Sequence, residues 1–117
     1  MKHVLVVDDV PEIRMVYRAL LTDSDLEVVE AASGEEALEV LKNIDVSLLV
    51  TDCQMPGMSG LEMVRQARAD HPELPLIVVS STADPDDFAE YNPLAVMSKP
   101  FRLTDLKDAV EGALGDS

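Results

Sequence analysis

Polar residues that could handle a phosphoryl group follow four separate apolar runs in this sequence. The runs and the residues that end them are 4–7 with Asp8 and Asp9, 46–50 with Thr51 and Asp52, 76–79 with Ser80, and 94–97 with Ser98 and Lys99. If the runs are parallel strands, their carboxyl ends lie on one edge of one sheet, which is where open α/β sheets bind ligands. Three carboxylates, a hydroxyl and an ammonium group would then converge.

Crowded carboxylates need compensating positive charge. Two unit charges about 4 Å apart repel by about 4 kcal/mol at an effective dielectric constant of about 20. Mg²⁺ binds through one or two carboxylates, keeps several waters and accepts phosphate oxygens, so it suits Asp8, Asp9 and Asp52. Lys99 adds a second cation and Ser80 a hydroxyl donor. Because a carboxylate can attack phosphorus and become an acyl phosphate, these residue types predict a phosphoryl-transfer site.

The elements between these residues predict a doubly wound α/β domain. Apolar runs alternate with segments of helical periodicity, which is typical of βα units and a mainly parallel sheet. Residues 27–31 form a further strand of mixed polarity, which favours a sheet edge. Five strands, about five helices and right-handed crossovers leave few topologies, and we expect the strand order 2-1-3-4-5 with the switch point between strands one and three.

The predicted helices are recognised by the residues at which they begin or end and by apolar residues at helical spacing, which form a stripe along one face. The signals are Pro11 before a stripe that ends at Leu21, a capping box at 33–36 before a helix to about Lys42, a helix over 60–70 that ends before His71 and Pro72, and a final stripe from Leu106 to Leu114.

Composition limits the possible functions. The 117 residues and 47% apolar content suit one domain over 1–117, and no apolar run is long enough to span a membrane. The single cysteine, Cys53, is compatible with a reducing compartment, so we expect a cytoplasmic protein without membrane contact. A net charge of −14 should repel a phosphate backbone, so we expect no direct nucleic-acid binding.

Together these motifs resemble the receiver domain of two-component response regulators, over essentially the whole chain. The matching residues are Asp8 and Asp9, the segment 52–60, Ser80, and Lys99 with Pro100 and Phe101. The resemblance implies a flavodoxin-like fold and a signalling switch that accepts a phosphoryl group from a histidine kinase or a phosphotransfer protein. An effector domain or protein outside this chain would carry the output, and no separate enzymatic turnover is expected.

The resemblance also implies a role for each site residue. Asp52 would be the phosphoacceptor, and Asp9, Asp52 and the backbone carbonyl of Gln54 would bind Mg²⁺, with Asp8 acting through water. Ser80 would bind a phosphoryl oxygen and Lys99 would pair with the phosphoryl group. A cis peptide bond would precede Pro100, although only about 5% of X-Pro bonds are cis.

Two departures from the receiver pattern lie between Ser80 and Lys99. Receivers usually carry an aromatic residue three positions before the lysine, where this chain has Val96. Tyr91 and Phe101 are the aromatic residues that could replace it. The segment is also short and contains Pro85 and Pro93, so we expect a fourth helix that is short or irregular.

Other interpretations remain open at this point. Taken alone, Asp8 and Asp9 could cap a helix, Ser80 could end a strand, and Lys99 could be a surface lysine. A phosphatase that forms an aspartyl phosphate would use similar chemistry, but such enzymes usually place a second acid where this chain has Gln54. A degenerate receiver that acts only by protein contact is a third possibility.

Overall fold

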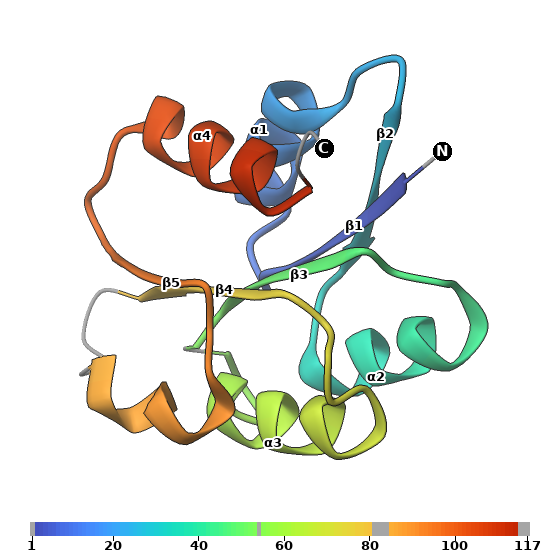
Figure 1. Cartoon of the computed structure of the whole chain (residues 1–117), viewed down its shortest axis with the longest axis vertical. Helices are drawn as coiled ribbons and strands as arrows, with labels where there is room; N and C mark the ends of the chain where they lie inside the picture. Colours follow the sequence, from blue (N-terminus) through green and yellow to red (C-terminus); the bar gives the residue numbers. More distant parts are fainter. Residues whose placement is uncertain (1, 54, 81–84, 115–117) are drawn as a thin grey trace.

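Alternating strands and helices build one parallel sheet with helices on both faces (Figure 1). The computed structural model describes residues 2–53, 55–80 and 85–114. The strands are β1 (Lys2–Val7), β2 (Leu26–Ala31), β3 (Leu48–Asp52), β4 (Leu76–Ser80) and β5 (Ala95–Ser98). The helices are α1 (Pro11–Leu21), α2 (Gly34–Asn43), α3 (Gly60–Asp70), the 3₁₀ helix η1 (Pro85–Tyr91) and α4 (Leu103–Leu114).

The sheet has the predicted order β2-β1-β3-β4-β5, and every neighbouring pair is parallel. Val7 at the end of β1 lies opposite Thr51 of β3, and Ser80 at the end of β4 lies opposite Ser98 of β5. The carboxyl ends of four strands therefore share one edge of the sheet.

Two apolar cores lie on opposite faces of this sheet. One core joins the sheet to α1 and α4, and the other joins it to α2, α3 and η1, as the layers in Figure 1 show. Alternation along β1 supplies both cores, since Val4 and Val6 face the first and Leu5 and Val7 face the second. Residues 4–7 of β1, 48–50 of β3 and 76–79 of β4 are all apolar and buried because helices cover both faces of these strands.

Side-chain caps fix where two helices begin. The hydroxyl of Ser33 accepts the N–H of Glu36, and the Glu36 carboxylate accepts the N–H of Ala32, which is a capping box shifted by one residue. Ser59 caps α3 in the same way by accepting the N–H of Glu62. Pro11 occupies the first turn of α1, as the sequence predicts.

The fourth helical segment is irregular, as expected. It is the 3₁₀ helix η1, and Phe88 anchors it in the core with 1% of its surface exposed. The peptide bond between Lys99 and Pro100 is cis, which confirms the geometry implied by the resemblance.

Strand β3 begins two residues later, and strand β5 one residue later, than the apolar runs 46–50 and 94–97. The run 46–50 predicts a strand that stops before Thr51, whereas β3 begins at Leu48 and includes Asp52. The N–H of Ser47 bonds the carbonyl of His3, so the residues before Leu48 connect to the sheet without belonging to the strand. In the described part of the chain, no helix has the length and apolar character needed to cross a membrane.

Candidate functional site

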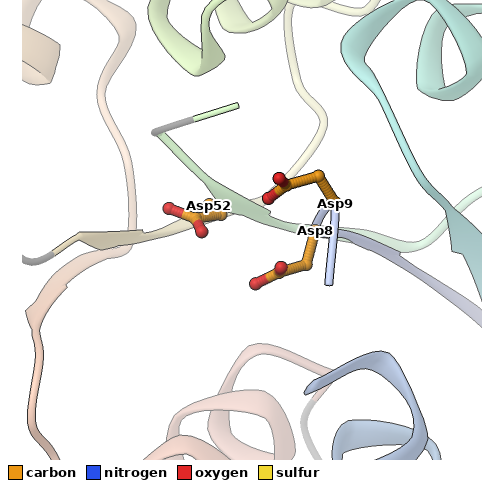
Figure 2. Close-up of side chains that lie close together, drawn as sticks. All are labelled: Asp8, Asp9 and Asp52. Carbon is orange, nitrogen blue, oxygen red and sulfur yellow. The ribbon is translucent and has the colours of Figure 1, made fainter. Parts of the chain in front are cut away.

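Three carboxylates meet at the carboxyl ends of β1 and β3. Asp8 and Asp9 follow β1, Asp52 is the last residue of β3, and one oxygen of each lies within 4.8 Å of the others. Figure 2 shows all three carboxylates extending to the same side of the strand ends. Asp8 and Asp52 are buried and Asp9 is exposed, so solvent reaches the cluster from the Asp9 side.

Ser80 and Lys99 lie next to this cluster, Ser80 at the end of β4 and Lys99 directly after β5. The Lys99 ammonium lies 3.3 Å from Oδ2 of Asp52 and donates a hydrogen bond to it. Ser80 is 2% exposed, and its backbone carbonyl accepts the N–H of Lys99 at 2.7 Å. The structure thus brings five of the six predicted site residues to one edge, while Gln54 lies outside the described residues.

Burial and neighbouring charges disfavour the ionised form of Asp8. Burial raises the pKa of the Asp8 carboxyl, and the charges of Asp52 and Asp9 raise it further. A hydrogen bond from the N–H of Val10 to Oδ1 at 2.9 Å and the charge of Lys99 act in the opposite direction. Without further positive charge, the folded protein therefore disfavours full ionisation of this cluster.

The charges of Asp8 and Asp52 also act on the buried phenol of Tyr17 in α1. Tyr17 is 6% exposed, and burial, followed by the charges of Asp8 and Asp52, raises its pKa to about 12. Tyr17 belongs to the core between the sheet and α1, so it lies beneath the acidic edge and not within it.

The backbone of Asp52 is held by close packing against α3. The N–H of Cys53 bonds the carbonyl of Val79, and the N–H of Gly60 bonds the carbonyl of Cys53. A Cβ atom on Gly60 would stand 2.4 Å from the Cα of Cys53 and 2.6 Å from the carbonyl oxygen of Asp52. Only glycine permits this approach, which fixes the start of α3 against the end of β3. Cys53 itself packs against the core, as predicted.

The aromatic residues considered as substitutes for Val96 lie on opposite faces of the sheet. Tyr91 packs against the same core as Val96, whereas Phe101 packs against the core beneath α1 and α4. Tyr91 therefore shares the Val96 side, and Phe101 does not.

Sequence reasoning missed one residue that touches this site. Arg14 of α1 donates a hydrogen bond from Nη1 to the backbone carbonyl of Asp8 at 2.6 Å. Its position five residues after Asp9 is the only signal in the sequence, and its ionic partner, Glu30, is distant along the chain.

The donor set fits a small divalent cation that prefers oxygen ligands. Three carboxylates carry more charge than the single ammonium of Lys99 can neutralise, and the exposed position of Asp9 leaves room for bound waters. These are the features of protein Mg²⁺ sites, which use few carboxylates and retain water.

Comparisons with known proteins agree with this geometry. The family model described as the response regulator receiver domain matches residues 4–111. The chain is 35% identical to the chemotaxis protein CheY of Pseudomonas aeruginosa, over 92% of each chain. It is also 37% identical to part of the sensor kinase CckA of Brucella abortus and 32% identical to part of the DNA-binding transcriptional regulator NtrC of Escherichia coli. The chain spans 12% of CckA and 24% of NtrC.

Solved structures show the same fold over nearly the whole chain. The response regulator TrrA of Thermotoga maritima, in complex with Mg²⁺ and BeF, has a TM-score of 0.87 at 31% identity and covers 97% of this chain and 99% of its own. A CheY-like receiver domain protein of Methanospirillum hungatei has a TM-score of 0.90 at 26% identity, with coverage of 97% and 94%. With its sheet order, its acidic edge and these matches, the chain belongs to the family of response regulator receiver domains.

Proposed function

We propose that this chain is a phosphorylation-dependent switch of a two-component system and that Asp52 is its phosphoacceptor. A histidine kinase or a histidine phosphotransfer protein would donate the phosphoryl group in a Mg²⁺-dependent reaction. The observation that carries the proposal is the position of Asp52, which is the one carboxylate shared by the acidic cluster and the Lys99 ion pair.

The geometry suits a transfer in which charge is neutralised locally. A carboxylate oxygen of Asp52 forms a bond to phosphorus while the P–N bond of the donor phosphohistidine breaks, and the imidazole nitrogen leaves with that electron pair. Lys99, already 3.3 Å from Asp52, would pair with the phosphoryl oxygens, and the Ser80 hydroxyl would donate to one of them. Mg²⁺, when bound by Asp8, Asp9, Asp52 and the carbonyl of Gln54, would neutralise further charge on those oxygens.

The relatives support both the cation and the partners. TrrA, at 31% identity, is in complex with Mg²⁺ and BeF, so a relative binds this cation together with an inorganic fluoride. The similarity to a part of a sensor kinase and to a part of a transcriptional regulator supports a kinase as donor and a separate effector as output. The cytoplasmic location and the absence of separate substrate turnover stay predictions.

Phosphorylation by a small donor tests the proposal without any partner. The protein is incubated with Mg²⁺ and acetyl phosphate and then measured by intact mass spectrometry. We expect a single added phosphate, which disappears when EDTA removes the Mg²⁺ and in the variant Asp52→Asn. Asp45→Asn is a matched control because this exposed acid precedes the opposite end of β3, and it should be labelled as the wild type is.

The remaining outcomes would favour a different function. Steady release of phosphate from a phosphate ester, over many turnovers, would favour an aspartate-nucleophile phosphatase. An unlabelled wild type would favour a receiver that acts by protein contact alone.

A further inference from the structure

Asp8 is tied to the rest of the fold at three points. Its N–H donates to the carbonyl of Ala31 at 3.1 Å, its carbonyl accepts Nη1 of Arg14 at 2.6 Å, and its Oδ1 accepts the N–H of Val10 at 2.9 Å. The first contact continues the pairing of β1 with β2 by one residue. Only the contact with Arg14 comes from a charged side chain.

The Arg14 side chain also bonds Glu30, an acid on β2, which is a strand that pairs with β1. Its Nε donates to Oε1 of Glu30 at 3.0 Å, and the Arg14 side chain is only 16% exposed. The next residue after Glu30 is Ala31, which accepts the N–H of Asp8. The contacts therefore close a ring that runs from Asp8 through Arg14, Glu30 and Ala31 back to Asp8.

A second arginine uses the other oxygen of the same acid. Arg18, one helical turn after Arg14 on α1, donates from Nε to Oε2 of Glu30 at 2.6 Å. Hydrogen bonds from Arg18 and then from Arg14 lower the pKa of the Glu30 carboxyl, so this acid is ionised at neutral pH. Arg14 and Arg18 thus carry the same charge and bond the same acid, but among the contacts of the described residues it is Arg14 that bonds Asp8.

The repulsion inside the cluster explains why such a ring matters. Asp8 is buried beside two other carboxylates, and the energy of that crowding falls if the loop after β1 moves outward. The Arg14 guanidinium bonds both the Glu30 carboxylate and the Asp8 carbonyl. These two bonds oppose that movement even when no cation is bound.

We propose that Arg14 is a positioning residue for cation binding, which holds the Asp8 backbone so that the three carboxylates stay preassembled. The proposal rests on the proposed function, because it assumes that the cluster binds Mg²⁺. Groups that orient the ligands of a metal typically change its affinity by about 10- to 100-fold when they are removed.

Mg²⁺ titration by calorimetry tests this role in the matched variants Arg14→Met and Arg18→Met. Each variant removes one positive charge and one bond to Glu30. If Arg14 acted only through its charge, both variants would bind Mg²⁺ more tightly than the wild type, because a repelling cation is lost. We expect Arg14→Met to bind Mg²⁺ about tenfold more weakly and Arg18→Met to bind as the wild type or slightly more tightly.

The outcomes distinguish a failure of the proposed function from a failure of the role assigned to Arg14. A wild type that binds no Mg²⁺ overturns the proposed function, and this inference with it. A wild type that binds, together with an Arg14→Met affinity equal to or tighter than that of Arg18→Met, overturns the inference alone.

A second pair of variants decides the matter if Arg14→Met does not fold. Arg14→Lys and Arg18→Lys keep both charges, but an ammonium lacks the planar fork that serves Glu30 and the Asp8 carbonyl together. We expect weaker Mg²⁺ binding only for Arg14→Lys, and equal affinities for the pair would contradict the role of Arg14.

Discussion

Asp52 combines burial, crowding and an ion pair in a single side chain. It is 7% exposed, lies within the acidic cluster and faces the Lys99 ammonium at 3.3 Å. Asp8 is 1% exposed and accepts a hydrogen bond from its own loop, and Asp9 is exposed. The three acids thus differ in environment although they share one edge, which is how neighbouring carboxylates come to have different roles.

The buried phenol of Tyr17 makes stability depend on pH in the alkaline range, first through its burial and then through the charges of Asp8 and Asp52. The folded protein raises the pKa of the phenol from 10.0 to about 12, so the contribution of Tyr17 to stability is complete below pH 10 and is lost as the pH rises toward 12. We expect urea denaturation in metal-free buffer to show this loss between those pH values. Tyr17→Phe should remove this part of the pH dependence, and an unchanged profile in that variant would contradict the assignment.

At the scale of elements, the site depends on how closely α3 approaches β3. Gly60 begins α3 directly against the backbone of Asp52 and Cys53. The N–H of Gly60 bonds the Cys53 carbonyl, so the helix start and the strand end form one unit.

Gly60→Ala should disturb that unit. The new Cβ would meet backbone atoms 2.4 and 2.6 Å away, so we expect a loss of about 1–3 kcal/mol in the free energy of unfolding and slower labelling of Asp52. The matched control is Gly112→Ala in α4, where, apart from the backbone of its own helix and its chain neighbours, no atom of the described residues lies within 4 Å of the added Cβ, and a gain of about 0.5–1 kcal/mol is expected. Equal effects of the two substitutions would contradict this packing argument.

Arg68 of α3 connects this helix to the segment around η1. Its guanidinium donates to the carbonyls of Tyr91, His71, Pro72 and Leu74 at distances from 2.6 to 3.2 Å. We expect Arg68→Met to lower the free energy of unfolding by about 2 kcal/mol and to speed hydrogen exchange of the Asn92 amide, which bonds within η1.

Arg65→Met is the control for this prediction. Arg65 lies on the same helix and pairs at the surface with Glu62, so its loss should destabilise the protein far less than the loss of Arg68 does. Equal destabilisation by the two substitutions would argue against Arg68 as the link to η1.

The sequence predicted those parts of the molecule that depend on local signals. Strand-end residues, apolar periodicity and the capping serine at Ser33 were sufficient for the order β2-β1-β3-β4-β5 and for the meeting of Asp8, Asp9, Asp52 and Lys99. These signals are local because neighbouring residues alone determine strand, turn and cap preferences.

The parts that escaped prediction depend on tertiary contacts. Arg14 meets Glu30 only because α1 packs against the edge strand β2, and their spacing in the sequence carries no periodic signal. Arg68 likewise bonds carbonyls of the loop that follows α3 and of Tyr91, the last residue of η1. Neither the face on which Tyr91 packs nor that of Phe101 follows from periodicity, because both residues lie outside the regular strands.

At the scale of the whole molecule, negative charge is in large excess. The chain carries 23 acidic and 9 basic residues, and within the described part of the chain four of the basic ones, Arg14, Arg18, Arg65 and Lys99, form ion pairs. The surface field therefore repels anions at a distance, whereas the site is expected to attract a phosphoryl group at close range.

This field predicts how salt changes the labelling rate. At saturating Mg²⁺, labelling by the anion acetyl phosphate should accelerate several-fold as the salt concentration rises through about 0.1 M, where the screening length is about 10 Å. Rates are measured by intact mass at matched Mg²⁺ occupancy, which is checked by doubling the Mg²⁺ concentration. A rate that falls with salt would mean that local attraction by Lys99 outweighs the net charge.

Chemical mapping tests most directly which side chain receives the phosphoryl group. Borohydride reduces an aspartyl phosphate to homoserine, so protein labelled with acetyl phosphate and Mg²⁺ can be reduced, digested and sequenced by mass spectrometry. We expect homoserine at position 52, and only when Mg²⁺ was present. Homoserine at Asp8 or Asp9, or at no position in labelled protein, would contradict the assignment of Asp52 as the phosphoacceptor.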